Sequence, residues 1–401
     1  MNERIVLGLG GTVDYEIDWD DAVVQALVDD YGIRRDELTR TAEIASERDL
    51  VVTILAFLAD GAGGERFASS SRIVEEFARR FPFRTTLGGT GIRAGYALAV
   101  HGLVATQHLV SIDDEVRRLL PAGNDSVSSA VEDSTDPHLI VQFPRGATVR
   151  LGTDVLEAPH PNRVIVSNDP PNRELRIAEG LGEVLTDAQV LLLSGFNSIQ
   201  DMDVLDERLR TIDRHLEALP RDAVVIYEDA GFHLPALQQR ARAALLRRVD
   251  VVSMNEDELQ ALLGRPLDLL DPEAVVSALS VASSALGSRD REGPVLVVHT
   301  RHWSAAVGAG AERYRGALAG GVRMASTRYL LGDAITVEDY DRVSRLPVQP
   351  GGERVCALVE TRLDACCLPA LVLETDRPTT IGLGDSFAGG FVSALVRGAA
   401  A

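Results

Sequence analysis

A glycine-rich turn near the C-terminus has the residue types with the clearest chemical use in this chain. It reads Gly382-Leu383-Gly384-Asp385 and leads into a run of small and apolar residues that reaches Val396. A Gly-x-Gly turn entering a helix exposes unpaired backbone N–H groups at the positive end of the helix dipole, where an anion can bind. A carboxylate at its edge can accept a proton from a hydroxyl group that attacks a bound phosphate. The turn predicts phosphoryl transfer to an alcohol; the alternative is a turn that needs only positive φ and an aspartate cap.

Two further acidic residues are expected at the ends of neighbouring strands. Glu228 follows the apolar run Ala223–Tyr227, and Glu258 lies three residues after Asn255, which itself follows an apolar run. Because open α/β sheets bind ligands at the carboxyl ends of their strands, Glu228 and Glu258 are candidates for holding Mg²⁺. Asn255 and Glu258 also have the spacing of a helix capping box, and this purely structural alternative stays open.

A second glycine-rich turn and an early aspartate could bind a polyhydroxylated substrate. Gly88-Gly89-Thr90-Gly91 precedes an expected helix at Ile92–Val100, and its glycines would let sugar hydroxyls approach the backbone. Asp14 follows the first expected strand, where its carboxylate could hold two vicinal hydroxyls. The alternatives are a turn that packs a strand closely against a helix and a solvated turn aspartate.

Short apolar runs alternate with amphipathic segments through most of the chain. Continuous apolar strands separated by helices predict an α/β fold with a doubly wound, mainly parallel sheet covered on both faces. The expected strands are Ile5–Leu9, Gln189–Leu193, Ala223–Tyr227, Val249–Met254 and Pro294–Val298, and the expected helices are Val204–Leu219, Pro235–Arg248 and Pro272–Leu286.

The segment 136–171 has a different pattern, because short strands follow one another with Pro, Gly and Asn turns and no helix between them. We expect it to form a small β-rich lid domain together with part of 13–49. Residues 122–136, rich in Ser, Asp and Gly, are expected to be a mobile connector. The large α/β nucleotide-binding domain is then expected to comprise 1–12, 50–135 and 172–401.

Composition limits the partners and the phosphate chemistry. The 401-residue chain is 45% hydrophobic with a mean hydropathy of +0.04, which suits a protein with a large core. Its net charge of −20 argues against nucleic acid as a partner, because there is no basic surface to collect backbone phosphates. All 40 basic residues are arginine, which excludes the phosphate loop Gly-x-x-x-x-Gly-Lys. Phosphate chemistry must therefore use arginine, backbone amides and metal.

Cysteine usage and hydropathy bear on the compartment. Cys356, Cys366 and Cys367 form no spaced framework for disulfides or metal, which fits a reducing cytoplasm. No basic-then-apolar leader precedes the first expected strand, and no apolar stretch reaches the roughly 18 residues that span a bilayer. We expect a cytoplasmic protein without a membrane partner.

Taken in order, these motifs resemble the ADP-dependent sugar kinases, the archaeal-type glucokinases and phosphofructokinases of the ribokinase-like superfamily. The segments around His138 and Asn162-Arg163 resemble the ADP-dependent branch in particular. The matching stretches are Gly88-Gly89, His138–Gly146, Asn162–Ile165, Leu193-Ser194-Gly195, Glu228, Asn255-x-x-Glu258, Val298-His299-Thr300 and Gly382-Leu383-Gly384-Asp385.

The resemblance implies a role for each matched residue. Asp385 would be the general base, and Arg163 would reach from the lid to the transferred phosphate. ADP, or ATP, would be the donor and a hexose or hexose phosphate the acceptor, with Mg²⁺ assisting a monomer or small homo-oligomer. The nucleotide would contact Gly382, Leu383, Gly384, Asn255, His299 and Thr300; the sugar would contact Asp14, Gly88, Gly89, Thr90 and His138; Mg²⁺ would be held by Glu228 and Glu258.

Three positions depart from the pattern of that family. Thr12 stands where the family usually has Asn, Thr90 where it often has Asn or Gln, and Ile226 where it has His. An ATP-dependent sugar or nucleoside kinase and a catalytically silent sugar- or nucleotide-binding protein stay open as alternatives, and Arg163 has the alternative of a solvated lid residue.

Overall fold

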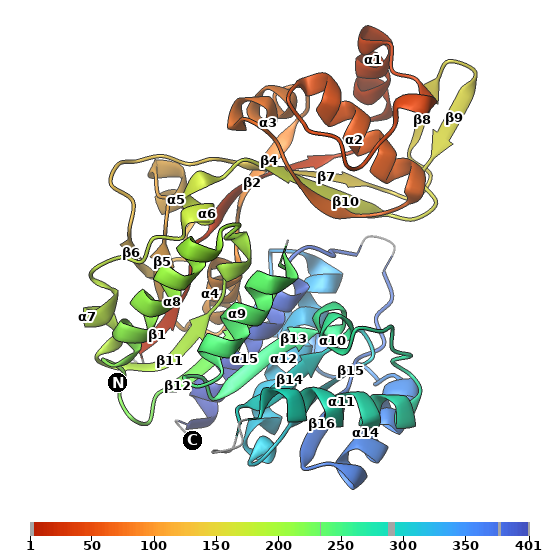
Figure 1. The fold of residues 1–401 in the computed structure, drawn as a ribbon. Coiled ribbons are helices and arrows are strands. Elements are labelled where there is room, and N and C mark those ends of the chain that lie inside the picture. Colours follow the sequence, from red (N-terminus) through yellow and green to blue (C-terminus); the bar gives the residue numbers. More distant parts are fainter. Residues whose placement is uncertain (1–3, 233, 288–292, 376–377, 400–401) are drawn as a thin grey trace.

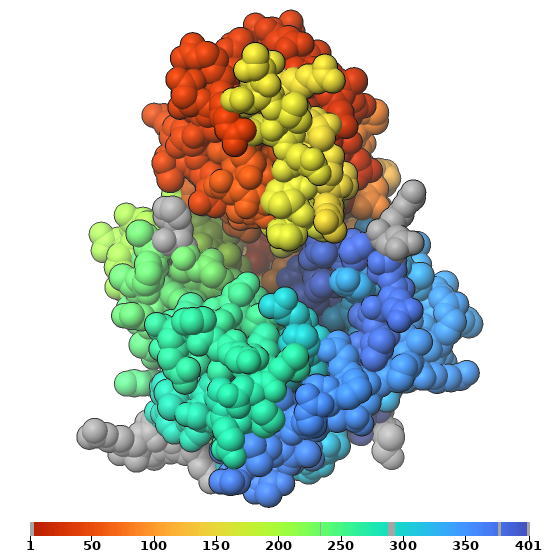
Figure 2. Space-filling view, turned by 90° about the vertical axis from the view of Figure 1, so that its right-hand side faces the viewer, coloured from red at the N-terminus to blue at the C-terminus, as the bar shows by residue number. Residues whose placement is uncertain are grey.

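The computed structural model describes residues 4–232, 234–287, 293–375 and 378–399, which form a large and a small part (Figure 1). The large part is built on a nine-stranded sheet and the small part on a five-stranded sheet. Figure 2 shows the small part seated on the large part, with a recess where the two meet. The expected α/β class, with a large mainly parallel sheet and a second β-rich unit, is confirmed.

The nine strands of the large sheet run parallel except at one edge, where the last two pairings are antiparallel. All five strands expected from apolar runs are present, because strands covered on both faces must be apolar along their whole length. In spatial order the strands are β16 (Ala365–Pro369), β15 (Trp303–Val307), β14 (Val295–His299), β13 (Val251–Asn255), β12 (Val224–Glu228), β11 (Ala188–Leu193), β1 (Arg4–Leu7), β5 (Thr106–Leu109) and β6 (Asp125–Ser128).

Helices cover both faces of the large sheet, as a doubly wound fold requires. On one face, buried apolar side chains of the sheet form one cluster with those of five helices. These are α8 (Met202–Leu216), α9 (Pro235–Leu245), α10 (Glu256–Leu263), α11 (Pro272–Leu286) and α14 (Pro350–Arg362). A second cluster, on the opposite face, buries α4 (Thr90–Val100), α12 (Arg315–Leu331) and α15 (Leu383–Ala399). The shorter helices of the large part are α5 (Asp114–Leu119), α6 (Pro170–Glu174), α7 (Leu181–Leu185) and α13 (Val337–Val343).

The small part is a five-stranded sheet whose helices, among the described residues, lie on one face. The helices are α1 (Asp21–Tyr31), α2 (Glu47–Asp60) and α3 (Ser71–Ala78), and they lie on the side away from the large part (Figure 1). The other face of the sheet is therefore directed toward the large part. In spatial order the strands are β3 (Gly64–Phe67), β10 (Asn162–Ser167), β7 (His138–Phe143), β2 (Thr12–Asp18) and β4 (Phe83–Gly88), and a separate hairpin is formed by β8 (Thr148–Leu151) and β9 (Asp154–Glu157).

Two segments lie elsewhere than the sequence led us to expect. Residues 50–88, expected in the large domain, contribute α2, β3, α3 and β4 to the small sheet and its apolar cluster. The apolar pattern of α2 predicts a buried helix but does not say which sheet it covers. Residues 122–136, expected as a mobile connector, contain β6, which pairs with β5 at the edge of the large sheet.

The remaining expectations concern membranes and thiols. No helix formed by the described residues is both long and apolar enough to cross a bilayer. The three cysteines are buried free thiols. The Sγ atoms of Cys356 and Cys367 lie 2.7 Å apart because α14 packs against β16, a proximity that the spacing of the cysteines did not indicate.

Candidate active site

The glycine-rich turn stands at the start of α15, as predicted. Gly382 has a φ of 67°, and Asp385 lies in the first turn of the helix that begins at Leu383. The first backbone N–H groups of a helix have no intrahelical partner, so this helix end can bind an anion. Asp385 Oδ1 accepts a hydrogen bond of 2.8 Å from Thr90 Oγ1. The two glycine-rich turns of the sequence are thus neighbours in space.

A buried arginine that the sequence analysis missed lies beside this turn. The side chain of Arg93, on α4, is 5% exposed; its Nη2 donates to Asp14 Oδ2 at 2.9 Å, and its Nε lies 3.7 Å from Asp385 Oδ2. Burial by itself would lower the pKa of Arg93, but three neighbouring carboxylates, first among them that of Asp14, raise it. A Cβ at position 382 would lie 2.7 Å from Arg93 Cδ, so the turn needs glycine there for space as well as for φ.

Asp14 is buried in β2 and is 3% exposed. Its Oδ1 accepts a hydrogen bond of 2.6 Å from Thr12 Oγ1, and its other oxygen binds Arg93. Gly88 lies opposite Thr12 on β4, and any side chain at position 88 would clash with the Asp14 carboxylate. The alternative of a solvated turn aspartate is therefore wrong. Gly89 forms the N-cap of α4, so the second glycine-rich turn also joins a strand closely to a helix.

His138 on β7 lies opposite Asp14 on the neighbouring strand β2. Its Nε2 is 3.0 Å from Asp169 Oδ2, which also accepts a hydrogen bond from Asn172. Burial lowers the pKa of His138, but the hydrogen bond and charge of Asp169 outweigh it and raise the pKa above its ordinary value. An imidazole held in this way has a fixed orientation and favours its protonated form. Asp14 and His138, two of the residues predicted to contact a sugar, thus lie together on the face of the small sheet that is directed toward the large part. This face is the floor of the small part.

Arg163 lies on β10, between the two parts. Val164 and Val166 point into the apolar cluster of the small part, so strand alternation directs Arg163 to the opposite face, toward the large part. Its Nε is buried and has no hydrogen-bond partner among the described residues. Burial lowers the pKa of Arg163, and the carboxylates of Glu65 and Asp385 act in the opposite direction. An unpartnered donor in this position disfavours the solvated alternative and supports a contact with a ligand.

Of the two residues predicted to hold Mg²⁺, Glu228 ends β12, and Glu258 lies in the first turn of α10, directly after the neighbouring strand β13. Glu228 Oε1 lies 3.0 Å from His299 Nε2, while its Oε2 is buried and unpartnered in the described part of the chain. Burial raises the pKa of Glu258 to about 7, and the charge of Glu228 adds to the rise. Within the described ranges, no group of three or more His, Cys, Asp or Glu could hold a metal ion. The unpartnered Oε2 of Glu228 and the raised pKa of Glu258 nevertheless fit Mg²⁺, which commonly takes its other ligands from water and substrate phosphates.

The other residues predicted to contact the nucleotide lie at the ends of β13 and β14, where Asn255 and His299 are the last strand residues and Thr300 follows. Asn255 and Glu258 form the capping box that was left open as an alternative: Asn255 Oδ1 accepts from the Glu258 N–H at 3.1 Å, and Glu258 Oε2 accepts from the Asn255 N–H at 2.7 Å. The Thr300 hydroxyl is bound within the following turn. The His299 ring stacks on Phe387 of α15, with centroids 4.4 Å apart. His299 therefore links the predicted metal ligands to the anion-binding helix.

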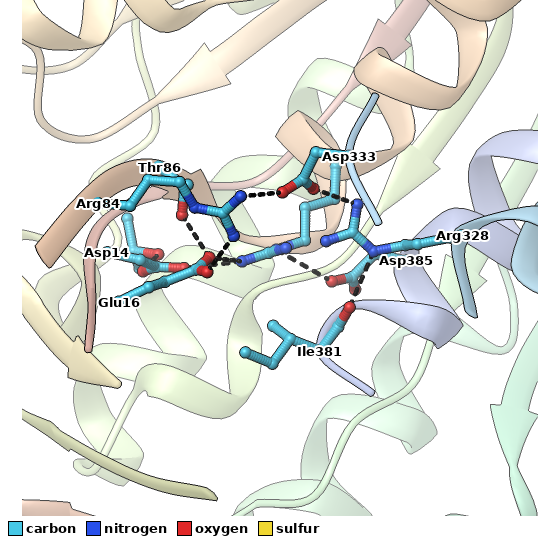
Figure 3. Close-up of polar contacts among 10 residues, drawn as sticks. Asp14, Glu16, Arg84, Thr86, Arg328, Asp333, Ile381 and Asp385 are labelled. Atoms are coloured by element: carbon cyan, nitrogen blue, oxygen red, sulfur yellow. Dashed lines mark hydrogen bonds and ion pairs between the residues drawn. The ribbon is translucent and has the colours of Figure 1, made fainter. Parts of the chain in front are cut away.

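Polar side chains of the small sheet continue from Asp14 toward the large part (Figure 3). Glu16, two residues further along β2 and on the same face, accepts hydrogen bonds from Arg84 at 2.5 Å and Thr86 at 2.6 Å, both on β4. Arg84 also reaches the large part, where its Nη1 lies 3.4 Å from Asp333 Oδ2. An ionic network therefore crosses between the two sheets.

On the large part this network ends at the anion-binding turn. Asp333, just after α12, accepts a hydrogen bond of 2.5 Å from Arg328 Nη1. Arg328 Nε in turn donates to the carbonyl oxygen of Ile381 at 2.8 Å, directly before the Gly-x-Gly-Asp sequence (Figure 3). The backbone of the turn is held by a side chain that is itself tied to the small part.

A doubly wound sheet with a Gly-x-Gly-Asp helix start beneath a small β-rich part is an arrangement suited to binding and transferring a phosphoryl group. Residues 3–393 match the family model described as the ADP-specific Phosphofructokinase/Glucokinase conserved region. The chain therefore belongs to this family.

Individual relatives are distant. The ADP-dependent glucose/glucosamine kinase of Pyrococcus abyssi (strain GE5 / Orsay) is 25% identical over 281 residues, which cover 62% of this chain and 59% of that protein. A hypothetical ADP-dependent phosphofructokinase from Pyrococcus horikoshii OT3 matches with a TM-score of 0.78 and 20% identity over 100% of this chain and 99% of its own. An ADP-dependent kinase complex with fructose-6-phosphate and ADPβS gives 0.71 and 18%, covering 98% and 94%. At these identities the structural likeness shows the fold.

Replacement of Glu258 separates a metal-binding role from a capping role. Because Gln at the same position keeps the capping box, Glu258→Gln is expected to raise the Mg²⁺ concentration needed for half-maximal rate without unfolding the helix start. Glu258→Ala removes the cap as well and should also cost about 1 kcal/mol of stability. Activity titrated with Mg²⁺ and thermal melts of both variants measure the two effects. An unchanged Mg²⁺ requirement in Glu258→Gln would mean that Glu258 acts only in the capping box and does not hold the metal.

The pH dependence of stability gives a check on Glu258 that needs no turnover. Its pKa is about 7 in the folded protein against 4.5 ordinarily, so the folded state holds a proton that the unfolded chain has lost. This contribution to stability is complete below pH 4.5 and is lost as the pH rises through about 7. We expect the melting temperature without Mg²⁺ to fall across this window, and Glu258→Gln to weaken that fall. Added Mg²⁺ should stabilise the unmodified protein more at pH 8 than at pH 6.

Proposed function

We propose that this protein is an ADP-dependent sugar kinase that phosphorylates a hydroxyl group of a hexose or hexose phosphate, with Asp385 as the general base. The observation that carries the proposal is a juxtaposition. Asp385, at an anion-binding helix start on the large part, faces the polar floor of the small part, which contains the buried Asp14 and the partly buried His138. A donor phosphate on one side and a polyhydroxylated acceptor on the other would meet at Asp385.

In the proposed reaction the acceptor oxygen forms a bond to the terminal phosphorus of ADP while its proton passes to an oxygen of Asp385. The bond between that phosphorus and the bridging oxygen breaks, and AMP leaves with the electron pair. Backbone N–H groups of Gly382 to Gly384 would bind the transferred phosphoryl group, and Arg163 would neutralise the charge that develops on it. Asp14 and His138 would orient the sugar, and Thr90 would hold Asp385 in place.

Glu228 and Glu258 would hold Mg²⁺, whose chemistry here is to neutralise phosphate charge. The unpartnered Oε2 of Glu228 and the raised pKa of Glu258 support this part of the proposal. The small part would also exclude water from the phosphoryl group, because water competes with the sugar hydroxyl as acceptor.

ADP is expected to support faster turnover than ATP. A site that fixes the adenine at one end and Asp385 at the other suits a chain of two phosphates or of three, but not both, because the reacting phosphorus is displaced by one phosphate unit. An activity matrix of ADP and ATP against hexoses, hexose 6-phosphates and nucleosides measures the preference. Faster turnover with ATP would overturn the donor assignment alone. Binding of sugar or nucleotide without turnover in every combination would make the protein a silent binding protein.

A further inference from the structure

The Arg93 side chain lies between two carboxylates that the proposed reaction uses, that of Asp14 to orient the acceptor and that of Asp385 to take its proton. One side of its guanidinium binds Asp14 on the small sheet, and its Nε faces Asp385 on α15. Glu16 stands slightly further away, with its Oε1 4.0 Å from Arg93 Nη2. One cation therefore lies among three carboxylates drawn from the two parts of the molecule, and the side chains of Arg93 and of Asp14 are each only 5% exposed.

Such a cluster is stable only while the cation is present. Three carboxylates packed together without a counterion repel one another, and this repulsion raises the free energy of keeping all three ionised. A guanidinium keeps its charge at any working pH and can bind two carboxylates through separate N–H groups. Lysine, with a single ammonium group, could not span the two in the same way.

We propose that Arg93 is a positioning residue for phosphoryl transfer, which supplies the positive charge beside the Asp385 carboxylate and holds it in a fixed relation to Asp14. The inference rests on the proposed function, since it gives Arg93 the task of aligning the proton acceptor with the floor that binds the acceptor sugar. The side chain of Arg93 is only 5% exposed, so it can act on both carboxylates without touching the substrate. Its N–H groups would act by keeping Asp385 able to accept a proton.

Other charged groups, on each neighbouring element, also face the cluster and contribute to its electrostatic balance. Those that surround the guanidinium and Asp385 are Asp14 and Glu16 from β2, Arg84 from β4, Arg163 from β10, and Arg328 and Asp333 from α12 and the segment after it. Arg84 and Arg328 are already paired with Glu16 and Asp333, so neither is free to replace Arg93 beside Asp385.

The test compares Arg93→Met and Arg93→Lys with a matched control, Arg242→Met. Arg242 is another buried arginine on a helix, paired with Asp229 in the core of the large part. For Arg93→Met we expect kcat at pH 7 to fall on the order of 10²-fold, with the KM for the donor nearly unchanged. In the pH profile of kcat/KM, the acidic limb should move to a higher pH by about one to three units. Arg242→Met should lose stability to a similar extent without moving that limb.

Arg93→Lys keeps a positive charge and covers the case in which Arg93→Met does not fold. Its acidic limb should stay near that of the unmodified protein, while its kcat falls by about tenfold because one ammonium group cannot hold both carboxylates. A folded Arg93→Met protein with an unmoved limb and a kcat within about twofold of the unmodified protein would overturn the proposal. So would an Arg93→Lys protein whose limb moves as far as that of a folded Arg93→Met protein.

A measurement without turnover separates this proposal from the proposed function. Carboxyl groups of ¹³C-labelled aspartate can be titrated by NMR, with Asp385→Asn used to assign the signal of Asp385. We expect the titration of Asp385 to move to higher pH in Arg93→Met and not in Arg242→Met. If the unmodified protein transfers no phosphoryl group but this shift occurs, the function is wrong and the electrostatic role of Arg93 stands. If the Asp385 signal does not move, the role of Arg93 is wrong even in an active kinase.

Discussion

Replacing Asp385 with asparagine is expected to abolish most turnover while leaving nucleotide binding intact. Asparagine has nearly the same shape, and its carbonyl oxygen can still accept the hydrogen bond from Thr90, so the helix start should keep its geometry. It cannot take a proton from the acceptor hydroxyl. Positioned proton transfer contributes roughly 10²–10⁴-fold to rate, so kcat should fall by about that factor. Steady-state kinetics with ADP and Mg²⁺, together with calorimetric titration of ADP, measure both quantities.

The control for this substitution is Asp203→Asn. Asp203 is also an aspartate in the first turn of a helix, α8, but it is exposed and lies on a different part of the surface. It should show turnover within about twofold of the unmodified protein, because surface substitutions away from special features have small effects. Near-normal turnover in a folded Asp385→Asn protein would remove Asp385 from the role of general base.

Strands of the large sheet were predictable because burial on both faces requires a continuous run of apolar residues. A strand such as β11 or β13 must be apolar at nearly every position, and this pattern needs no knowledge of its neighbours. The start of α8 is similarly local, since the Asp201 side chain caps its first N–H groups. The antiparallel pairings of β15 and β16 were not predicted, because direction depends on how the chain returns and not on which residues are apolar.

Residues 50–88 were expected in the large domain but belong to the small sheet and its apolar cluster. An apolar pattern does not show which sheet a segment packs against. α2 has a run of buried residues from Leu50 to Leu58, which predicts a buried helix without naming the sheet beneath it. β3 alternates half-buried and exposed residues over only four positions, too short to be recognised as a strand. What places this segment is its pairing with β10, which lies about a hundred residues later in the chain.

The candidate site was predictable where a turn determines the chemistry, as at Gly382 to Asp385. The sequence analysis missed Arg93, although an arginine within the apolar run Ile92 to Leu98 gave one usable indication. A charge on the buried face of a helix needs a partner, and burial without one is costly. Its partners Asp14 and Asp385 are supplied by strands and helices far apart in the chain, so only the packing of the two parts reveals them.

Arg163→Ala is expected to lower kcat far more than nucleotide affinity. The chain contains no lysine, so arginine must supply the positive charge that neutralises a moving phosphoryl group. Arg163 is positioned for this by β10, with a buried Nε that has no partner within the described residues. An arginine in that role in other phosphoryl-transfer enzymes is worth about 10³–10⁵ in rate. Steady-state kcat and the KM for ADP, measured for Arg163→Ala and Arg163→Lys, give the size of the effect.

Arg66 provides the matched control for this prediction, because it belongs to the same sheet on the neighbouring strand β3 and its guanidinium donates to the carbonyl of Ala42 within the small part. Arg66→Ala removes equal charge and similar packing, yet it should leave kcat within about twofold. Arg163→Lys restores a charge without the planar pair of N–H groups, so it should recover only part of the rate. If Arg163→Ala and Arg66→Ala behave alike, the contribution of Arg163 is general charge or packing in the small part. If only Arg163→Ala loses rate, the charge must be needed at that position, where the phosphoryl group would pass.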